Sequence, residues 1–208
     1  MPVYRNVESA IAAVVENRVS IVKLQTGAPI GARIIDLVEA LKQNTSLKKL
    51  TLDGQSISAE GAESLAEYLQ QNPRLEHFSL FHNCIGAAGA AAIGASLTSN
   101  RKLNDLDLGD NAIGDDGAVA LAASLMQNRT VTYVRLHNDG IGAAGAAALA
   151  ELVSKCYTLE EICLYGNKIG DDGAVAIGAA LGRAAGKTTI TTTFPSVLLL
   201  CCCRVRGR

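Results

Sequence analysis

Apolar residues recur along the chain in blocks that begin 28 residues apart. Each block opens with the spacing L-x-x-L-x-L, as in LNDLDL from Leu103, and its last two apolar positions alternate as in a strand with one buried face. A turn follows, and then an alanine- and leucine-rich stretch such as GAVALAASL, with apolar residues at helical spacing. The pattern therefore predicts one strand and one helix in every unit.

The period can be followed through six units. Five regular blocks begin at Leu47, Leu75, Leu103, Val131 and Leu159, and extrapolation backwards adds a sixth at Val19. A single unit cannot bury its own apolar face, so the units must stack, with the strands in one parallel sheet and the helices behind it.

The same pattern divides the chain into three parts. We expect an N-terminal capping helix over 1–18, six 28-residue repeats over 19–186 and an irregular C-terminal cap or tail over 187–208. Within the tail, the threonine, isoleucine and phenylalanine residues of 188–194 favour a last edge strand that covers the array.

One unit shows all the recurring positions. They are Leu103, Leu106, Leu108, Asn111, Ile113, Gly114, Gly117, Ala118 and Leu121. This pattern resembles the leucine-rich repeats of ribonuclease-inhibitor type, which are shared by NOD-like receptors, Ran GTPase-activating proteins and tropomodulin-like proteins. The resemblance implies an α/β fold class: a curved solenoid with a parallel β-sheet on the concave face and α-helices on the convex face. It leaves function open, because the family is united by architecture.

In that family an asparagine after the strand satisfies backbone groups where the chain bends. Asn83, Asn111 and Asn167 match it, whereas the other units have Gln55, Asp139 and Gly27 at this position. The first unit also has Pro29 in place of the following isoleucine, so we expect a bulge or a looped-out segment there. A second series, at the helix ends, consists of Asn44, Asn72, Asn100 and Asn128. Asparagine tolerates the left-handed conformation that closes a helix, which is the role we predict for this series.

Two pairs of acidic residues invite a catalytic or metal-binding interpretation. Asp115 and Asp116, and then Asp171 and Asp172, fall just after the turn, where each helix begins. Carboxylates there cap free backbone N–H groups and meet the positive end of the helix dipole. Since neighbouring repeats lie about 4.8 Å apart, pairs two units apart are separated by roughly 10 Å. That distance is too long for one metal ion, so we assign both pairs to the scaffold.

The residues between the apolar positions of each strand point away from the helices, onto the concave face. There they combine aromatic rings, one guanidinium and several charges, which are the groups that anchor protein interfaces. We predict a partner-binding patch formed by His77, Phe81, Asp105, Asp107, Tyr133, Arg135, His137, Glu161 and Tyr165. The alternative is a solvated sheet face with cross-strand pairs, His77 with Asp105 and Asp107 with Arg135.

Composition limits the kinds of partner and the cellular compartment that we expect. The formal net charge of −1 gives no sign of nucleic acid as a partner, and no apolar run is long enough to span a bilayer. No C-x-x-C spacing and no signal peptide are found, so we expect a cytoplasmic monomer without cofactor or metal. For the tail two interpretations stay open, a weak lipid anchor at Cys201, Cys202 and Cys203 or a frayed terminus.

The sequence therefore favours a non-enzymatic module that binds a protein partner through its concave face. A second hypothesis rests on the resemblance to Ran GTPase activators, which contribute loop residues of an early repeat to a bound GTPase. Arg33, in the irregular first loop QTGAPIGAR, is the residue that would stand for their functional arginine.

Overall fold

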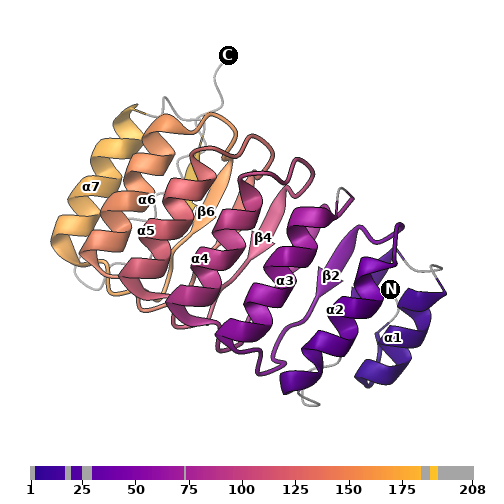
Figure 1. Ribbon diagram of the computed structural model, residues 1–208. Coiled ribbons are helices and arrows are strands. Elements are labelled where there is room, and N and C mark those ends of the chain that lie inside the picture. The colour runs from indigo at the N-terminus through magenta and orange to yellow at the C-terminus, as the bar shows by residue number, and fades with distance from the viewer. Residues whose placement is uncertain (1–2, 17–19, 25–29, 73, 184–187, 192–208) are drawn as a thin grey trace.

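The computed structural model describes residues 3–16, 20–24, 30–72, 74–183 and 188–191, and it has one layer of strands and one layer of helices (Figure 1). The strands are β1 (Ile21–Lys23), β2 (Lys49–Thr51), β3 (His77–Ser79), β4 (Asp105–Asp107), β5 (Tyr133–Arg135), β6 (Glu161–Cys163) and β7 (Thr189–Thr191). They form a single seven-stranded sheet in chain order, and every pair of neighbours is parallel. β7 lies within the segment in which we expected an edge strand.

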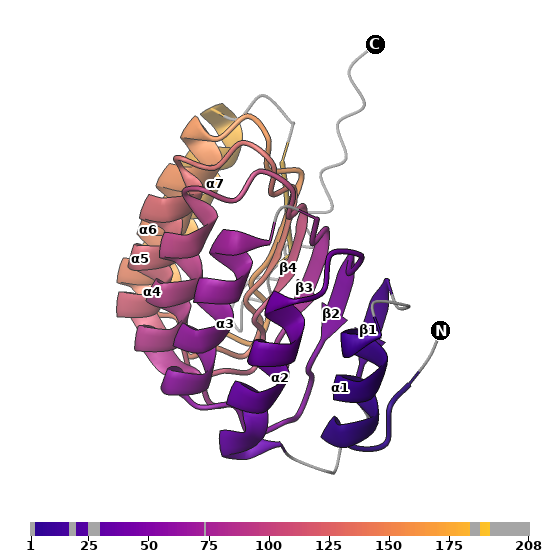
Figure 2. The same ribbon diagram turned by 45° about the vertical axis from the view of Figure 1, so that its right-hand side comes forward.

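The helices alternate with the strands and stack side by side in the second layer, on the opposite side from the open face of the sheet (Figure 2). They are α1 (Val7–Val15), α2 (Ile34–Lys42), α3 (Ala59–Gln71), α4 (Gly86–Leu97), α5 (Gly114–Leu125), α6 (Ala143–Lys155) and α7 (Gly170–Arg183), with a short 3-10 helix η1 (Gly31–Arg33) before α2. In the described part of the chain, none of them is long and apolar enough to cross a bilayer. The α/β solenoid predicted from the repeat pattern is confirmed.

The 28-residue period is also the register of the sheet. Ile21 pairs with Lys49, Lys49 pairs with His77, and the same step continues to Thr189 at the last strand. The alternation within each strand puts one leucine row into the core. Leu52, Leu80, Leu108, Leu136 and Leu164 are all at most 1% exposed, as the pattern predicts. The predicted bulge of the first unit at Gly27 and Pro29 lies outside the described residues.

In the third, fourth and sixth units, the asparagine that follows the strand ties the unit to the one before it. The side-chain oxygen of Asn83 accepts the backbone N–H groups of Gln55 and Ile57, both at 3.0 Å. Its amide nitrogen donates to the carbonyls of Leu52 at 2.9 Å and Leu80 at 2.8 Å. One buried side chain thus satisfies four backbone groups from two repeats, which would otherwise be left unpaired away from water.

Asp139 occupies this position with a carboxylate in place of an amide. Its Oδ1 accepts the Asn111 N–H at 2.7 Å, but within the described chain its buried Oδ2 has no hydrogen-bond partner. The equivalent atom of Asn167 is an amide nitrogen that donates to the carbonyls of Leu136 and Leu164. Burial raises the pKa of Asp139 to about 7, although the N–H groups of Asn111 and Ile113 oppose the shift.

The left-handed conformation predicted for the asparagine series at the helix ends is wrong, because none of the four residues has a positive φ. The series works by side-chain hydrogen bonds instead. Asn72 is extended, with φ −89° and ψ 110°. The Oδ1 of Asn100 accepts two N–H groups, from Lys102 and Leu103, at 2.9 Å each. Its Nδ2 donates to the carbonyls of Leu69 at 2.8 Å and Asn72 at 3.2 Å, in the preceding repeat. The series is therefore a second set of links between repeats.

The first acidic pair is part of the scaffold, but it acts on the next helix rather than on its own. Asp115 Oδ1 accepts the N–H groups of Gly142 at 2.7 Å and Gly145 at 2.8 Å, at the start of α6. The N-cap of α5 itself, Ile113, makes no side-chain capping bond. The carboxylate therefore caps a helix that carries no capping side chain of its own, because Gly142 stands at its N-cap.

Leu108 should be a critical core position. We expect Leu108→Ala to lower the free energy of unfolding by roughly 2–5 kcal/mol, because the truncation leaves a cavity in the stacked leucine row. Val119, which is 45% exposed on α5, gives the matched control, and its change to alanine should cost less than about 0.5 kcal/mol. Chemical denaturation of both variants measures the difference, and equal losses would contradict the assigned core.

Asp139→Asn should make the protein more stable at alkaline pH. The folded-state pKa of about 7 lies above the ordinary aspartate value of 3.8, so the folded state holds this proton longer than the unfolded state does. Stability from this group is therefore lost as pH rises between those two values. We expect the variant to melt about 5 °C higher at pH 8, with the gain shrinking towards pH 4. A gain that is independent of pH would point to packing instead of ionisation.

Asp115 and Asp171 occupy equivalent positions but should differ in their contribution to stability. Asp115→Ala removes the cap of α6 and should cost about 1 kcal/mol. Asp171 lies at the start of α7, after which the described residues contain no further helix to cap, so Asp171→Ala should cost clearly less. Thermal melting of the two variants makes the comparison, and a larger loss for Asp171→Ala would refute capping across repeats.

Candidate partner-binding face

The outward-facing residues of the strands form three rows across the sheet. The first contains His77, Asp105, Tyr133 and Glu161, and the second contains Ser79, Asp107, Arg135 and Cys163. The third follows the strand ends and contains Phe81, Gly109, His137 and Tyr165, where the N–H groups of successive loops continue to donate to the carbonyls of the next repeat. The structure thus brings all nine predicted residues onto one face.

Asp105 is the centre of an ionic network in the first two rows. Its Oδ2 lies 2.7 Å from Nδ1 of His77, and its Oδ1 accepts from Nη1 of Arg135 at 2.5 Å. Burial tends to raise the pKa of Asp105, but the two hydrogen bonds outweigh it and hold the pKa below its ordinary value. The expected pair of His77 with Asp105 is present. Arg135 bonds this diagonal neighbour and not Asp107, its expected cross-strand partner.

Asp107 stands beside this network with fewer partners. Its Oδ1 accepts the N–H of Gly109 at 3.1 Å, and among the described residues no side chain is seen to donate to it. Burial raises the pKa of Asp107, and the carboxylate of Asp53 adds to the rise. Asp53 itself accepts the hydroxyl of Ser79 at 2.5 Å. Sequence reasoning missed Asp53, although it occupies the same repeat position as Phe81, one unit earlier.

The third row is an aromatic stack that crosses four repeats. The rings of His137 and Tyr165 lie 4.7 Å apart and are nearly parallel, and the centroid of Phe81 is 5.2 Å from that of His137. Gly109 makes this possible, because a Cβ there would lie 2.3 Å from the His137 ring. The imidazole therefore fills the space above the glycine and joins rings that belong to the third and sixth repeats.

The position after the aromatic row is governed by backbone geometry. His82 has φ 56°, Asp110 has φ 59° and Asn138 has φ 57°, and the other two regular repeats have glycine there. Aspartate, asparagine, histidine and glycine are the residues that enter this left-handed region most readily. His82 and Asp110 also form an exposed ion pair at the border of the face.

Exposure separates the residues that a partner could touch from those that support them. Tyr133 is 37% exposed and Tyr165 is 43% exposed, whereas His137 is only 7% exposed and lies in the floor of the face. The Tyr133 hydroxyl donates to Glu160 at 2.8 Å, a contact that the repeat pattern alone did not reveal. Two large rings and the half-buried Arg135 thus stand out from a polar floor.

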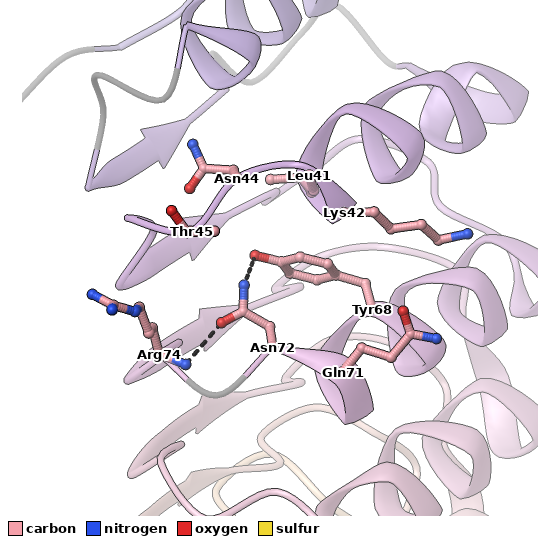
Figure 3. Close-up of a pocket in the computed structure, with 8 residues that line it drawn as sticks. All are labelled: Leu41, Lys42, Asn44, Thr45, Tyr68, Gln71, Asn72 and Arg74. Atoms are coloured by element: carbon pink, nitrogen blue, oxygen red, sulfur yellow. Dashed lines mark hydrogen bonds between the residues drawn. The ribbon is translucent and has the colours of Figure 1, made fainter.

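A pocket of about 220 Å³ lies elsewhere, between the ends of α2 and α3 (Figure 3). Here the Nδ2 of Asn72 donates to the hydroxyl of buried Tyr68, at 2.5 Å. By the spacing seen for Asn100, it would otherwise reach the carbonyls of Leu41 and Asn44. Tyr68 thus interrupts the chain of helix-end links, and the pocket marks that interruption. Burial raises the pKa of Tyr68, so its hydroxyl stays neutral at physiological pH.

Other candidate chemistry is not assembled by the fold. In the part of the chain that the structure describes, no three histidine, cysteine, aspartate or glutamate side chains are grouped to hold a metal. Arg33 ends η1 and forms ion pairs with Glu8 and Asp36. The cysteines of the proposed lipid anchor, Cys201, Cys202 and Cys203, lie outside the described residues.

Comparisons with known proteins agree with this architecture. A family model described as leucine-rich repeat matches residues 71–94, 99–122 and 155–178. A solved structure of the leiomodin-1 actin-binding site 2 aligns with a TM-score of 0.61 and 23% identity, covering 74% of this chain and 88% of that one. The tropomodulin C-terminal domain of Caenorhabditis elegans aligns with a TM-score of 0.54 and 16% identity, over 86% and 93% of the two chains.

A search of curated proteins gives no match. Each matched segment runs from the end of one repeat through the strand and into the helix of the next. The solved neighbours share the fold. The chain thus contains leucine-rich repeats, and its fold is a leucine-rich repeat solenoid of ribonuclease-inhibitor-like type.

Proposed function

We propose that the chain is a non-enzymatic protein-interaction module that binds a protein partner through the concave face of its sheet. The observation that carries the proposal is the gathering of exposed aromatic rings and a guanidinium over β3–β6. Two of the three exposed tyrosines among the described residues, Tyr133 and Tyr165, belong to this face, and the third, Tyr157, lies outside its rows. Tyrosine and arginine are enriched at the centres of protein interfaces, where they supply most of the binding energy.

The fold supports this use of the face. In a parallel sheet backed by helices on one side only, the second side is left open for contact, and among the described residues no helix lies over it (Figure 2). The leiomodin-1 domain that shares the fold is named as an actin-binding site, so the same architecture binds a protein elsewhere. The groups on this face suit recognition better than catalysis, because His77 and Arg135 are both bonded to Asp105.

Alanine variants separate binding from folding. We expect weaker partner binding from each of Tyr133→Ala, Arg135→Ala and Tyr165→Ala. One or two of these variants should lose about 2 kcal/mol or more of binding free energy. Their melting temperatures should hardly change, because these side chains point off the sheet. Val175→Ala, on the exposed side of α7 at 72% exposure, is the control on the helix face and should leave binding intact.

The partner itself can be located by photo-crosslinking. A crosslinking amino acid at position 165 should capture a protein from a native extract, whereas the same group at position 175 should not. Both positions are exposed and belong to the same repeat, so they differ mainly in the face they occupy. Capture from position 175 alone would place the partner on the helices and refute the assignment of the binding face.

A further inference from the structure

The concave face carries opposite charges at its two ends. Lys23 and Lys49 lie on β1 and β2 and outnumber the one carboxylate there, Asp53 after β2, whereas three carboxylates, Asp105, Asp107 and Glu161, lie on β4–β6. Arg135 is the one arginine among them, and it bonds Asp105. The whole chain is close to neutral, with a formal charge of −1, so the polarity is a property of this face and not of the protein at large.

Asp107 is a carboxylate of the β4–β6 half to which no cationic side chain is bonded among the described residues. Arg135 is its neighbour in the sheet register, but its Nη1 bonds Asp105 instead. The Asp107 carboxylate accepts a hydrogen bond from the backbone N–H of Gly109. Partial burial makes its ionised form costly and raises the pKa of Asp107, although the Gly109 N–H and the nearby charges of Arg135 and His137 oppose the rise. A positive group brought to this point would remove much of that cost.

The aromatic row lies immediately beside this carboxylate. Gly109 follows Asp107 by two residues, just past the end of β4, which is about 7 Å in an extended chain, and the His137 ring stands over Gly109. Tyr165 continues the stack and exposes 43% of its surface. A guanidinium fits such a place well, because it can bond a carboxylate and lie against an aromatic face at the same time.

We propose that the half of the concave face over β4–β6 receives an arginine-bearing segment of the protein partner, with a guanidinium at Asp107 and its stem along the rings of His137 and Tyr165. This inference rests on the proposed function and adds the chemistry of the partner to it. Glu161, one strand beyond Tyr133, offers a second acidic contact for the same segment. The lysines on β1 and β2 set its direction, since they favour an acidic or neutral residue at the other end.

The charge pattern of this face disfavours anionic and apolar ligands. A phosphate backbone or an acidic peptide would meet a net negative surface over β4–β6, and bringing like charges together at an interface is unfavourable. An apolar segment would cover the carboxylate of Asp107 without giving it a partner, which adds desolvation and no compensating bond. Of these occupants, only a cationic one satisfies both the carboxylates and the rings.

A peptide titration tests the inference without knowledge of the natural partner. The probe is a short peptide of alternating arginine and glycine, added to the ¹⁵N-labelled full chain and followed by amide chemical shifts. We expect shifts concentrated on β4–β6, binding that weakens as salt rises, and little response to the same peptide with citrulline or glutamate in place of arginine. A lysine version should bind more weakly, because it cannot stack.

Two variants identify the carboxylates. Asp107→Asn keeps an acceptor for the Gly109 N–H but removes the charge. It should lower the affinity for the arginine peptide about fivefold or more. Glu161→Gln provides a second test, because the Glu161 side chain bonds no backbone group in the described chain. Asp116→Asn is the matched control, because Asp116 is an exposed carboxylate at the start of α5 and should leave the affinity unchanged.

The outcomes also separate this inference from the function on which it rests. Equal binding of the glutamate and arginine peptides, no arginine binding at all, or unchanged affinity in both Asp107→Asn and Glu161→Gln would overturn the arginine assignment. Crosslinking from position 165 could still succeed in that case, which would keep the binding face and reject only its partner chemistry. Shifts confined to the helices would reject both.

Discussion

The whole structure depends on the pairing of buried backbone groups at the bend between each strand and its helix. The chain must turn there once every 28 residues. The turn lies against the core, so water cannot pair with the backbone N–H and C=O groups that the turn leaves without a partner. A single asparagine amide meets this requirement by bonding its own repeat and the one before it. Because its reach is short and fixed, each repeat must stack on its predecessor in one register. The leucine rows, the parallel sheet and the alignment of the outward rows follow from that register.

The fixed register also creates the candidate binding face. Residues at one repeat position are brought side by side, so a row of unrelated residues in the sequence becomes a continuous surface. The stack of Phe81, His137 and Tyr165 forms in this way, and the absence of a side chain at Gly109 closes the gap in it. Since the inward and outward positions alternate, the face can change its chemistry while the core stays constant. In the proposed function, recognition and stability are carried by different residues of the same strand.

The repeat pattern predicts whatever depends only on period. It gives the strands, the leucine core and the nine residues of the concave face, because each of these follows from counting along the chain. It fails where a side chain chooses among several neighbours within reach. Arg135 bonds Asp105 on the diagonal and Asp115 caps the next helix. The Tyr68 hydroxyl draws Asn72 away from the preceding repeat. Such choices depend on side-chain length and on local competition for hydrogen bonds, which a periodic pattern does not contain.

Asp139 shows that the separation between scaffold and surface is incomplete. It occupies the asparagine position, where its buried Oδ2 has no donor in the described chain, and burial is the main reason that its pKa is raised to about 7. The carboxylates of Asp110 and Asp107 add to that rise from the adjoining face. The negative charge that suits the face to a cationic partner therefore also makes this scaffold carboxylate harder to ionise. A positive charge near Asp107, as the proposed partner would supply, would lower the electrostatic cost of ionising both carboxylates.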